Sequence, residues 1–304
     1  MKWFYFALGA MFLWSGSDLF SKLGCQSEKD KYSHLKMVMA VGLIMGLHAC
    51  YEIFVGGTEI SFSILLAYLP VSALYILSMA IGYLGLRYIE LSISSPVCNS
   101  SGAIVAILTI ITVGFGEISG WQLAALICVC VGVIALGIVQ MTEDDELRAL
   151  RQEKSNRKYT KSVIALVIPL VYCLLDALGT FADSLVLETL NEDSANVAYE
   201  LTFLFVGIFC AVYVLGIKKQ KLVPKQETPK YIGAIFETAG QFCYIYALAD
   251  REHVMYSAPI ISAYCAVSVL LSRIFLKEKL SWKHYAAIAV TVAGIVILGL
   301  FDEL

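Results

Sequence analysis

The feature that most constrains the fold of this chain is a succession of long apolar segments. The hydrocarbon core of a bilayer is about 30 Å thick, so an α-helix needs about 20 residues to cross it. At that length the 304-residue sequence divides into ten apolar segments. They cover residues 3–24, 35–55, 62–86, 92–115, 119–140, 162–187, 195–217, 230–249, 254–276 and 282–300. The sequence therefore predicts an all-α integral membrane protein with ten transmembrane helices.

Composition supports this class and excludes others. Charged residues make up 15% of the chain, compared with about 25% in an average soluble domain. No basic patch is interleaved with aromatic residues outside the loops, so nothing favours nucleic-acid binding. Most of the nine cysteines lie inside apolar segments, and none belongs to a CxxC motif or a zinc-type Cys/His cluster. We therefore expect no metal site and no cofactor.

Basic residues are distributed unevenly between the predicted connections. Of the 22 lysines and arginines, all but Lys2 and Arg251 lie in or next to the odd-numbered connections. By the positive-inside rule, these connections are cytoplasmic and both termini face outward. We expect the protein to lie in the plasma (inner) membrane with lipid around it.

The chain also contains an internal repeat. The segment "GEISGWQLAALICVCVGVIALG" (116–137) resembles "KEKLSWKHYAAIAVTVAGIVILG" (277–299), and "SSPVCNSS" (94–101) resembles "SAPIISAY" (257–264). Trp14-x-x-x-Asp18 likewise matches Tyr172-x-x-x-Asp176. The matches predict five helices per copy, and an odd number makes the second copy insert upside down. Inverted repeats of this kind recur in secondary transporters, which bind substrate near the midplane.

A polar, mixed-charge run separates the two copies. It reads "TEDDELRALRQEKSNRKY" and starts at residue 142. We therefore predict a first five-helix repeat over residues 1–141, a cytoplasmic connecting loop over 142–160 and a second repeat over 161–304.

Several polar and ionisable residues fall inside the predicted helices. A charge at a helix centre costs at least about 2.5–3.5 kcal/mol and normally faces a cavity or the protein interior. At spacings of three or four residues, these side chains share helix faces. The candidates for substrate binding are Trp14, Asp18, Tyr75, Tyr172, Asp176, Glu237, Gln241 and Tyr244. Asp176 and Glu237 are also candidates for ion coupling, because no basic residue lies within one turn of either.

Structural alternatives exist for some of these charges. Asp18 could pair with Lys22, which lies four residues further on the same face, and Lys22 could extend to the membrane surface. Glu52, Asp183 and Glu200 lie in the outer thirds of their helices, where hydrated interfacial positions are equally consistent. The Gly-x-x-x-Gly motif at residues 42–46 could pack helices within one chain or between two.

The repeat segments carry a family resemblance. "LWSGSDLFSKLG" (13–24) resembles the opening segment, and "LKEKLSWKHYAAIAVTVAGIVILG" (276–299) the closing segment, of EamA-type members of the drug/metabolite transporter superfamily. Ser15 and Lys277 stand where that family usually has glycine. The resemblance implies two copies of five helices and alternating access. It also implies that helices one to four and six to nine surround a cavity, while helices five and ten lie outside it.

Together these features predict a secondary active transporter with an acidic and aromatic cavity. Such a cavity suits a small cationic or zwitterionic amine, such as choline, a polyamine or an amino acid, because carboxylates and aromatic faces both attract ammonium groups. A carboxylate at membrane depth could also carry a coupling proton or bind another coupling cation.

Three other functions are open to different degrees. An anionic or sugar-nucleotide substrate would require several basic residues in the cavity, and Lys22 is the one candidate. A membrane channel is also compatible with the predicted helices. An enzyme is not expected, because the sequence has no HExxH, GxSxG or Walker motif.

Overall fold

The computed structural model describes residues 2–25, 30–88, 95, 98–113, 119–141, 163–277 and 280–301. Over these residues the chain is helical and contains no strand. The predicted connecting loop at 142–160 lies outside the described residues, as do Glu117, Pro96 and Glu278 of the repeat segments. Each of the ten predicted spans overlaps a helix, so the prediction of an all-α membrane protein is confirmed.

The helices have the following bounds. In the first half they are α1 (Lys2–Cys25), α2 (Ser33–Tyr51) continued by η1 (Glu52–Gly56), α3 (Phe62–Tyr88), α5 (Ser101–Val113) and α6 (Gly120–Met141). In the second half they are α8 (Val163–Val186), α9 (Glu192–Ala211) continued by η3 (Val212–Ile217), α10 (Pro224–Leu248), η4 (Arg251–His253), α11 (Val254–Ser262), α12 (Tyr264–Leu271) continued by η5 (Ser272–Leu276), and α13 (Trp282–Phe301).

Six helical segments of the described residues are long and apolar enough to cross a membrane. They are Ser33–Gly56, Phe62–Leu86, Gly120–Val139, Val167–Val186, Glu192–Ile217 and Val254–Leu276. α5 and α13 are apolar but shorter. α1 and α10 are long enough but more polar, since α1 carries Asp18 and Lys22, and α10 carries Glu227, Lys230 and Glu237. These two polar helices pack against each other, which shields their charges from lipid.

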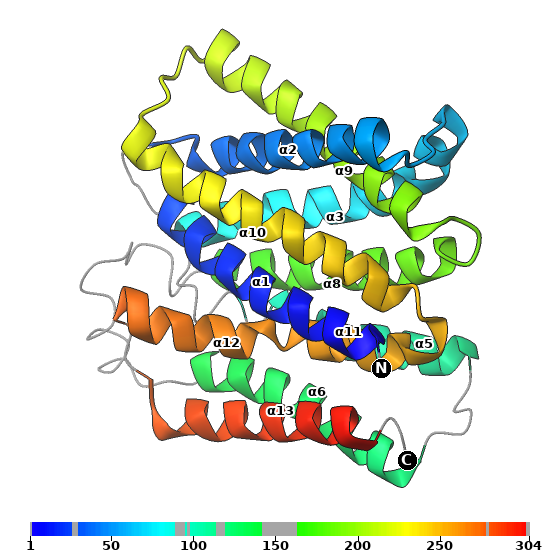
Figure 1. The fold of residues 1–304 in the computed structure, drawn as a ribbon. Coiled ribbons are helices and arrows are strands. Elements are labelled where there is room, and N and C mark those ends of the chain that lie inside the picture. Colours follow the sequence, from blue (N-terminus) through cyan, green and yellow to red (C-terminus); the bar gives the residue numbers. More distant parts are fainter. Residues whose placement is uncertain are drawn as a thin grey trace.

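The other helices also pack in pairs that join the two halves of the chain. α2 packs on α9, α3 on α8, α5 on α11, and α6 on α13 (Figure 1). α6 and α13 lie together at one side of the bundle, while every residue of α11 is buried in its interior. Both termini lie at the same end of the helices, which we call the terminal end. The opposite end, where α1 ends and α2 and α10 begin, we call the basic end.

Small residues allow two of these helix pairs to approach closely. A Cβ on Gly42 of α2 would lie 2.7 Å from the carbonyl oxygen of Phe203 and 3.0 Å from the Cα of Gly207, both in α9. A Cβ on Gly294 of α13 would lie 2.7 Å from the carbonyl oxygen of Ala125 in α6. The motif at residues 42–46 therefore packs helices within this chain.

The predicted ninth span is not one continuous helix. It is divided at Ala263, whose N–H donates to the carbonyl oxygens of Pro259 at 3.0 Å and Ile260 at 3.1 Å. Proline lacks the N–H that would continue the hydrogen-bond ladder, and it favours such an interruption. A turn at Asn99 and Ser100 precedes α5 in the other half of the chain. Both interruptions lie beside the cavity described next.

Candidate functional site

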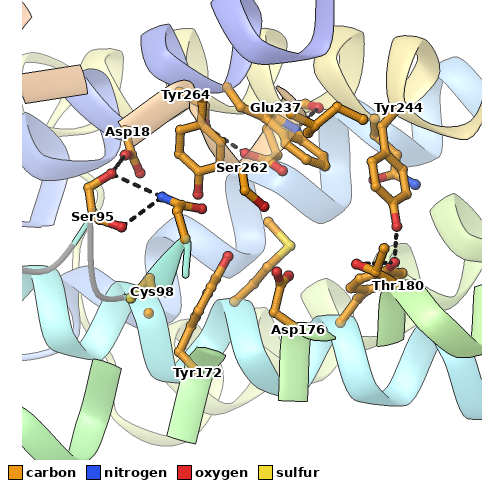
Figure 2. A pocket seen from close by; sticks show the side chains of 18 of the residues that line it. Asp18, Ser95, Cys98, Tyr172, Asp176, Thr180, Glu237, Tyr244, Ser262 and Tyr264 are labelled. Carbon is orange, nitrogen blue, oxygen red and sulfur yellow. Dashed lines mark hydrogen bonds between the residues drawn. The ribbon is translucent and has the colours of Figure 1, made fainter. Parts of the chain in front are cut away.

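A central cavity of about 940 Å³, part of it continuous with solvent, lies between helices from both halves. Its lining includes every residue predicted to bind substrate: Trp14, Asp18, Tyr75, Tyr172, Asp176, Glu237, Gln241 and Tyr244. Figure 2 shows Asp176 and Glu237 on opposite walls, with Asp18 toward one end and Tyr244 toward the other. The spacing of three or four residues brings these side chains together because their helices face one centre.

Each acid of the cavity accepts a hydrogen bond from a serine on a neighbouring segment. The Oγ atoms of Ser95 and Ser268 donate to Asp18 at 2.6 and 2.9 Å. In the same way Ser101 donates to Asp176 at 2.7 Å, and Ser17 to Glu237 at 2.7 Å. Across the described residues, none of the three acids forms an ion pair with lysine, arginine or histidine. A hydroxyl orients a carboxylate without neutralising its charge, so the charge stays available to a ligand.

The predicted alternative of an Asp18–Lys22 ion pair is wrong. Lys22 is buried, and its Nζ donates to the carbonyl oxygen of Leu86 at 2.9 Å. Leu86 lies in the last turn of α3, where carbonyl groups have no partner within the helix and attract a cation. Lys22 is therefore held against the end of α3 and does not line the cavity.

Aromatic rings form much of the remaining wall. Seven line the cavity: Trp14, Tyr75, Tyr83, Tyr172, Tyr199, Tyr244 and Tyr264. The ring centroid of Trp14 lies 5.0 Å from that of Tyr244 and 5.9 Å from that of Tyr264. The Tyr75 centroid lies 5.9 Å from that of Tyr244. The rings thus make a nearly continuous surface beside the acids.

Two tyrosines contact each other at the end of the cavity that lies nearer the terminal end. The hydroxyl groups of Tyr75 and Tyr244 contact each other, and Tyr75 also donates to Oγ1 of Thr180 at 3.1 Å. We call Tyr75, Thr180 and Tyr244 the tyrosine contact. Figure 2 shows Tyr244 and Thr180 meeting at this end of the cavity.

Two acids for which a hydrated position was open are instead completely buried. Asp183 and Glu200 both have 0% exposed surface. Glu200 accepts from Nδ1 of His48 at 2.9 Å and from the Asn196 amide at 3.1 Å, so it has a partner on α2 as well as on its own helix. Asp183 accepts a hydrogen bond at 2.7 Å from the hydroxyl of Tyr68.

The sequence did not identify the serines that hold the acids. Ser95, Ser101 and Ser268 are distant from their partners along the chain, so helical spacing could not connect them. One signal was present, because Ser95 and Ser101 belong to the repeated segment 94–101. By itself, that similarity indicates only a repeat.

Comparison with known proteins finds a family match in the second half of the chain. Residues 162–300 match the model of the EamA-like transporter family. A solved structure described as "Crystal structure of protein" resembles this chain with a TM-score of 0.66, covering 99% of this chain and 97% of that chain. The sequence identity is 11%, so the likeness concerns the fold alone. No curated protein gives a significant match.

Proposed function

Residues 162–300 identify this chain as an EamA-type transporter of the drug/metabolite transporter superfamily, and on that premise we propose that it carries a small cationic or zwitterionic amine by alternating access. The predictions of this family, of a membrane transporter of small molecules and of a non-enzymatic function are confirmed by that match. The amine substrate and the roles of individual residues are our proposal. The observation that carries it is a cavity with three unpaired acids, and no lysine, arginine or histidine among its described lining residues.

The two kinds of attraction in this cavity differ in strength. Unit charges 4 Å apart interact by about 4 kcal/mol at an effective dielectric constant of about 20. A cation over an aromatic face gains about 0.5–1 kcal/mol at an exposed site and about 2 kcal/mol when desolvated. We therefore assign most of the affinity to Asp18, Asp176 and Glu237, and assign the fit around the ammonium group to the rings.

A polar donor in the same cavity supports a substrate with a second functional group. The side-chain amide nitrogen of Gln241 is buried and has no hydrogen-bond partner. An unsatisfied buried donor costs about 1–3 kcal/mol, and a ligand oxygen would remove that cost. Gln241 is thus suited to a carboxylate or hydroxyl oxygen of an amino acid or amino alcohol.

The helix pairing supports two inverted five-helix repeats, with boundaries at residues 141 and 161. Suppose that the first to fifth helices correspond in order to the sixth to tenth. Exchanging the two repeats then turns the pair α1–α10 into the pair α8–α3. It leaves each of the pairs α2–α9, α5–α11 and α6–α13 unchanged. All of these pairs occur. The repeats would form two rocking halves around the cavity, as alternating access requires.

Glycine contacts suggest the register of the repeat. Gly240 faces the ring of Trp14, and Gly82 faces the ring of Tyr172. The offset is 158 residues both between the glycines and between the rings. This register supports the predicted equivalence of Trp14-x-x-x-Asp18 and Tyr172-x-x-x-Asp176.

We propose that the basic end is cytoplasmic and that both termini face outward from a plasma membrane, since basic residues favour the cytoplasmic side. The tyrosine contact would then close the outward side of the cavity. It also argues against the alternative of an open channel. The alternative of an anionic or sugar-nucleotide substrate is disfavoured by the absence of basic residues among the described cavity residues.

A ligand screen tests the proposed substrate class. The purified protein should gain thermal stability with choline, spermidine or amino acids, and not with nucleotide sugars. Asp176→Asn should lose that gain while it keeps the unfolding temperature of the unliganded protein. Glu59→Gln removes an exposed acid and serves as the control. Stabilisation by anions alone would refute the amine proposal.

A further inference from the structure

Asp176 lines the cavity, but it is not the most buried acid on α8. Asp183 lies seven residues after Asp176, near the terminal end of the same helix, and does not line the cavity. It is completely buried, whereas Asp176 is partly exposed to the cavity. Its Oδ1 accepts from the Tyr68 hydroxyl at 2.7 Å, but its Oδ2 has no hydrogen-bond partner. A buried carboxyl group with an unsatisfied oxygen is costly and needs an explanation.

Among the described residues, the titratable groups around Asp183 are four tyrosines and one acid, Asp176. Tyr68 and Tyr75 approach it from α3, Tyr244 from α10 and Tyr199 from α9. α5 also packs on α8 and contributes no titratable residue. The nearest charged group on its own helix is Asp176. No lysine, arginine or histidine of the described residues therefore compensates a charge on Asp183.

A negative charge at this position would be poorly stabilised. A buried ionised carboxylate requires an opposite charge or several donors, and the described groups around Asp183 offer only tyrosine hydroxyls, none of which is hydrogen-bonded to Oδ2. Binding of a proton at Oδ2 removes the charge without any further ligand. A metal ion would need more oxygen ligands, and the described residues contain no group of three or more histidine, cysteine or acidic side chains that could hold one.

The tyrosine contact separates this acid from the cavity. Tyr75, Thr180 and Tyr244 line the cavity, and the two tyrosines also interact with Asp183. If the tyrosine contact opens during transport, Asp183 gains access to water and can exchange its proton. The same movement opens the substrate cavity toward the terminal end.

We propose that Asp183 is the proton-binding site of this transporter, separate from the acids that bind the amine. The inference rests on the proposed function, because it assigns the coupling ion of that transport cycle. The proton binds at Oδ2 from water on one side of the membrane and leaves to water on the other side. No other bond forms or breaks. Asp176 and Glu237 then serve substrate binding, although the sequence predicted coupling for them.

Proteoliposome transport separates coupling from substrate binding. Labelled choline, spermidine and lysine are each offered under a pH gradient, and in a second arm as equilibrium exchange without a gradient. Asp183→Asn should lose gradient-driven accumulation and keep exchange at the wild-type rate, because asparagine imitates the protonated acid. A trapped pH-sensitive dye should report substrate-dependent proton movement in the wild type and none in this variant.

Other variants make each outcome decisive. Asp176→Asn should lose exchange as well as accumulation, and Glu59→Gln should resemble the wild type. Tyr68→Phe keeps the acid but removes its donor, so it should retain proton movement with an altered pH profile. Wild-type accumulation by Asp183→Asn, or accumulation driven by a sodium gradient in place of a pH gradient, would overturn the inference. Failure of all three amines to exchange in the wild type would refute the proposed function instead.

Discussion

Two groups of acids lie inside this protein, and they differ in their partners. At the basic end, Asp30 and Glu227 form a network with Lys36 and Lys230. Nζ of Lys36 lies 2.9 Å from Oδ2 of Asp30 and 3.3 Å from Oε1 of Glu227. Nζ of Lys230 lies 2.9 Å from Oε2 of Glu227. The side chains of this network are 1–6% exposed. Among the described residues, by contrast, the cavity acids have serine hydroxyl groups as hydrogen-bond partners and no cationic partner.

The kind of partner, a lysine or a serine hydroxyl group, distinguishes an acid that stabilises the fold from an acid that can bind a ligand. Charge is compensated within the protein in the basic-end network, so the network can stabilise the ends of α1, α2 and α10 and has no charge left for a ligand. The cavity acids retain their charge for a cation that comes from outside. Burial of an acid is therefore a weaker indication of function than the absence of a cationic partner.

The largest effect is expected in the network. Lys230→Met keeps most of the side-chain volume but removes one of the two lysines that pair with Glu227 and Asp30. Breaking a buried ion pair costs about 3–5 kcal/mol, so the unfolding temperature in detergent should fall markedly. Amine exchange per folded molecule should be unchanged. Lys225→Met, at an exposed position of the same helix, is the matched control. A stable Lys230→Met protein without exchange would reverse the comparison.

The next effect concerns the cavity. Glu237→Gln removes a charge without removing a compensated pair, so stability should be unchanged while affinity for an amine decreases. The attraction between unit charges 4 Å apart is about 1–4 kcal/mol for effective dielectric constants between about 80 and 20, so its loss should lower affinity by about 5- to 1,000-fold. Calorimetric titration with choline measures the change.

The pH dependence of that titration gives a second test. Choline keeps its charge at every pH, so only the acids titrate. Protonation removes their charge, and wild-type affinity should therefore fall as the pH is lowered. Part of this dependence should disappear in Glu237→Gln. Affinity that rises on acidification would contradict a cation site.

The sequence predicted the fold well because membrane helices are encoded locally. An apolar run of about 20 residues is a sufficient signal, and each of the ten predicted ranges overlaps a helix. The interruption at Ala263 was not predicted, because Pro259 in an apolar segment is compatible with a kink as well as a break.

The site was predicted as a set of residues but not as a network. Helical spacing identified the faces that carry Asp176 and Glu237, since i and i+4 positions are close in any helix. It could not identify the serine donors, the interaction of Lys22 with Leu86 or the burial of Asp183. These depend on which helices become neighbours, and the order of neighbours is a property of the tertiary fold.

A smaller effect is expected from the aromatic wall. Trp14→Leu keeps an apolar side chain in α1 but removes the ring that faces Tyr244 and Tyr264. The loss of a cation–π contact costs about 0.5–2 kcal/mol, so choline affinity should decrease by about two- to thirtyfold. Phe12→Leu changes an exposed ring of the same helix and should leave affinity unchanged. An equal loss in both variants would attribute the effect to folding of α1 and not to the cavity.

The smallest effect separates an acid from the hydroxyl group that holds it. Ser101→Ala leaves the charge of Asp176 in place but removes the donor that fixes its carboxyl group. The substrate must then order this side chain on binding, at a cost of about 1 kcal/mol, or about fivefold in affinity. Ser184→Ala is the matched control, because that hydroxyl donates to the carbonyl oxygen of Phe181 on its own helix. If Ser101→Ala abolished binding as completely as Asp176→Asn, the serine itself would contact the substrate, and the division between charged ligands and neutral supports would be wrong.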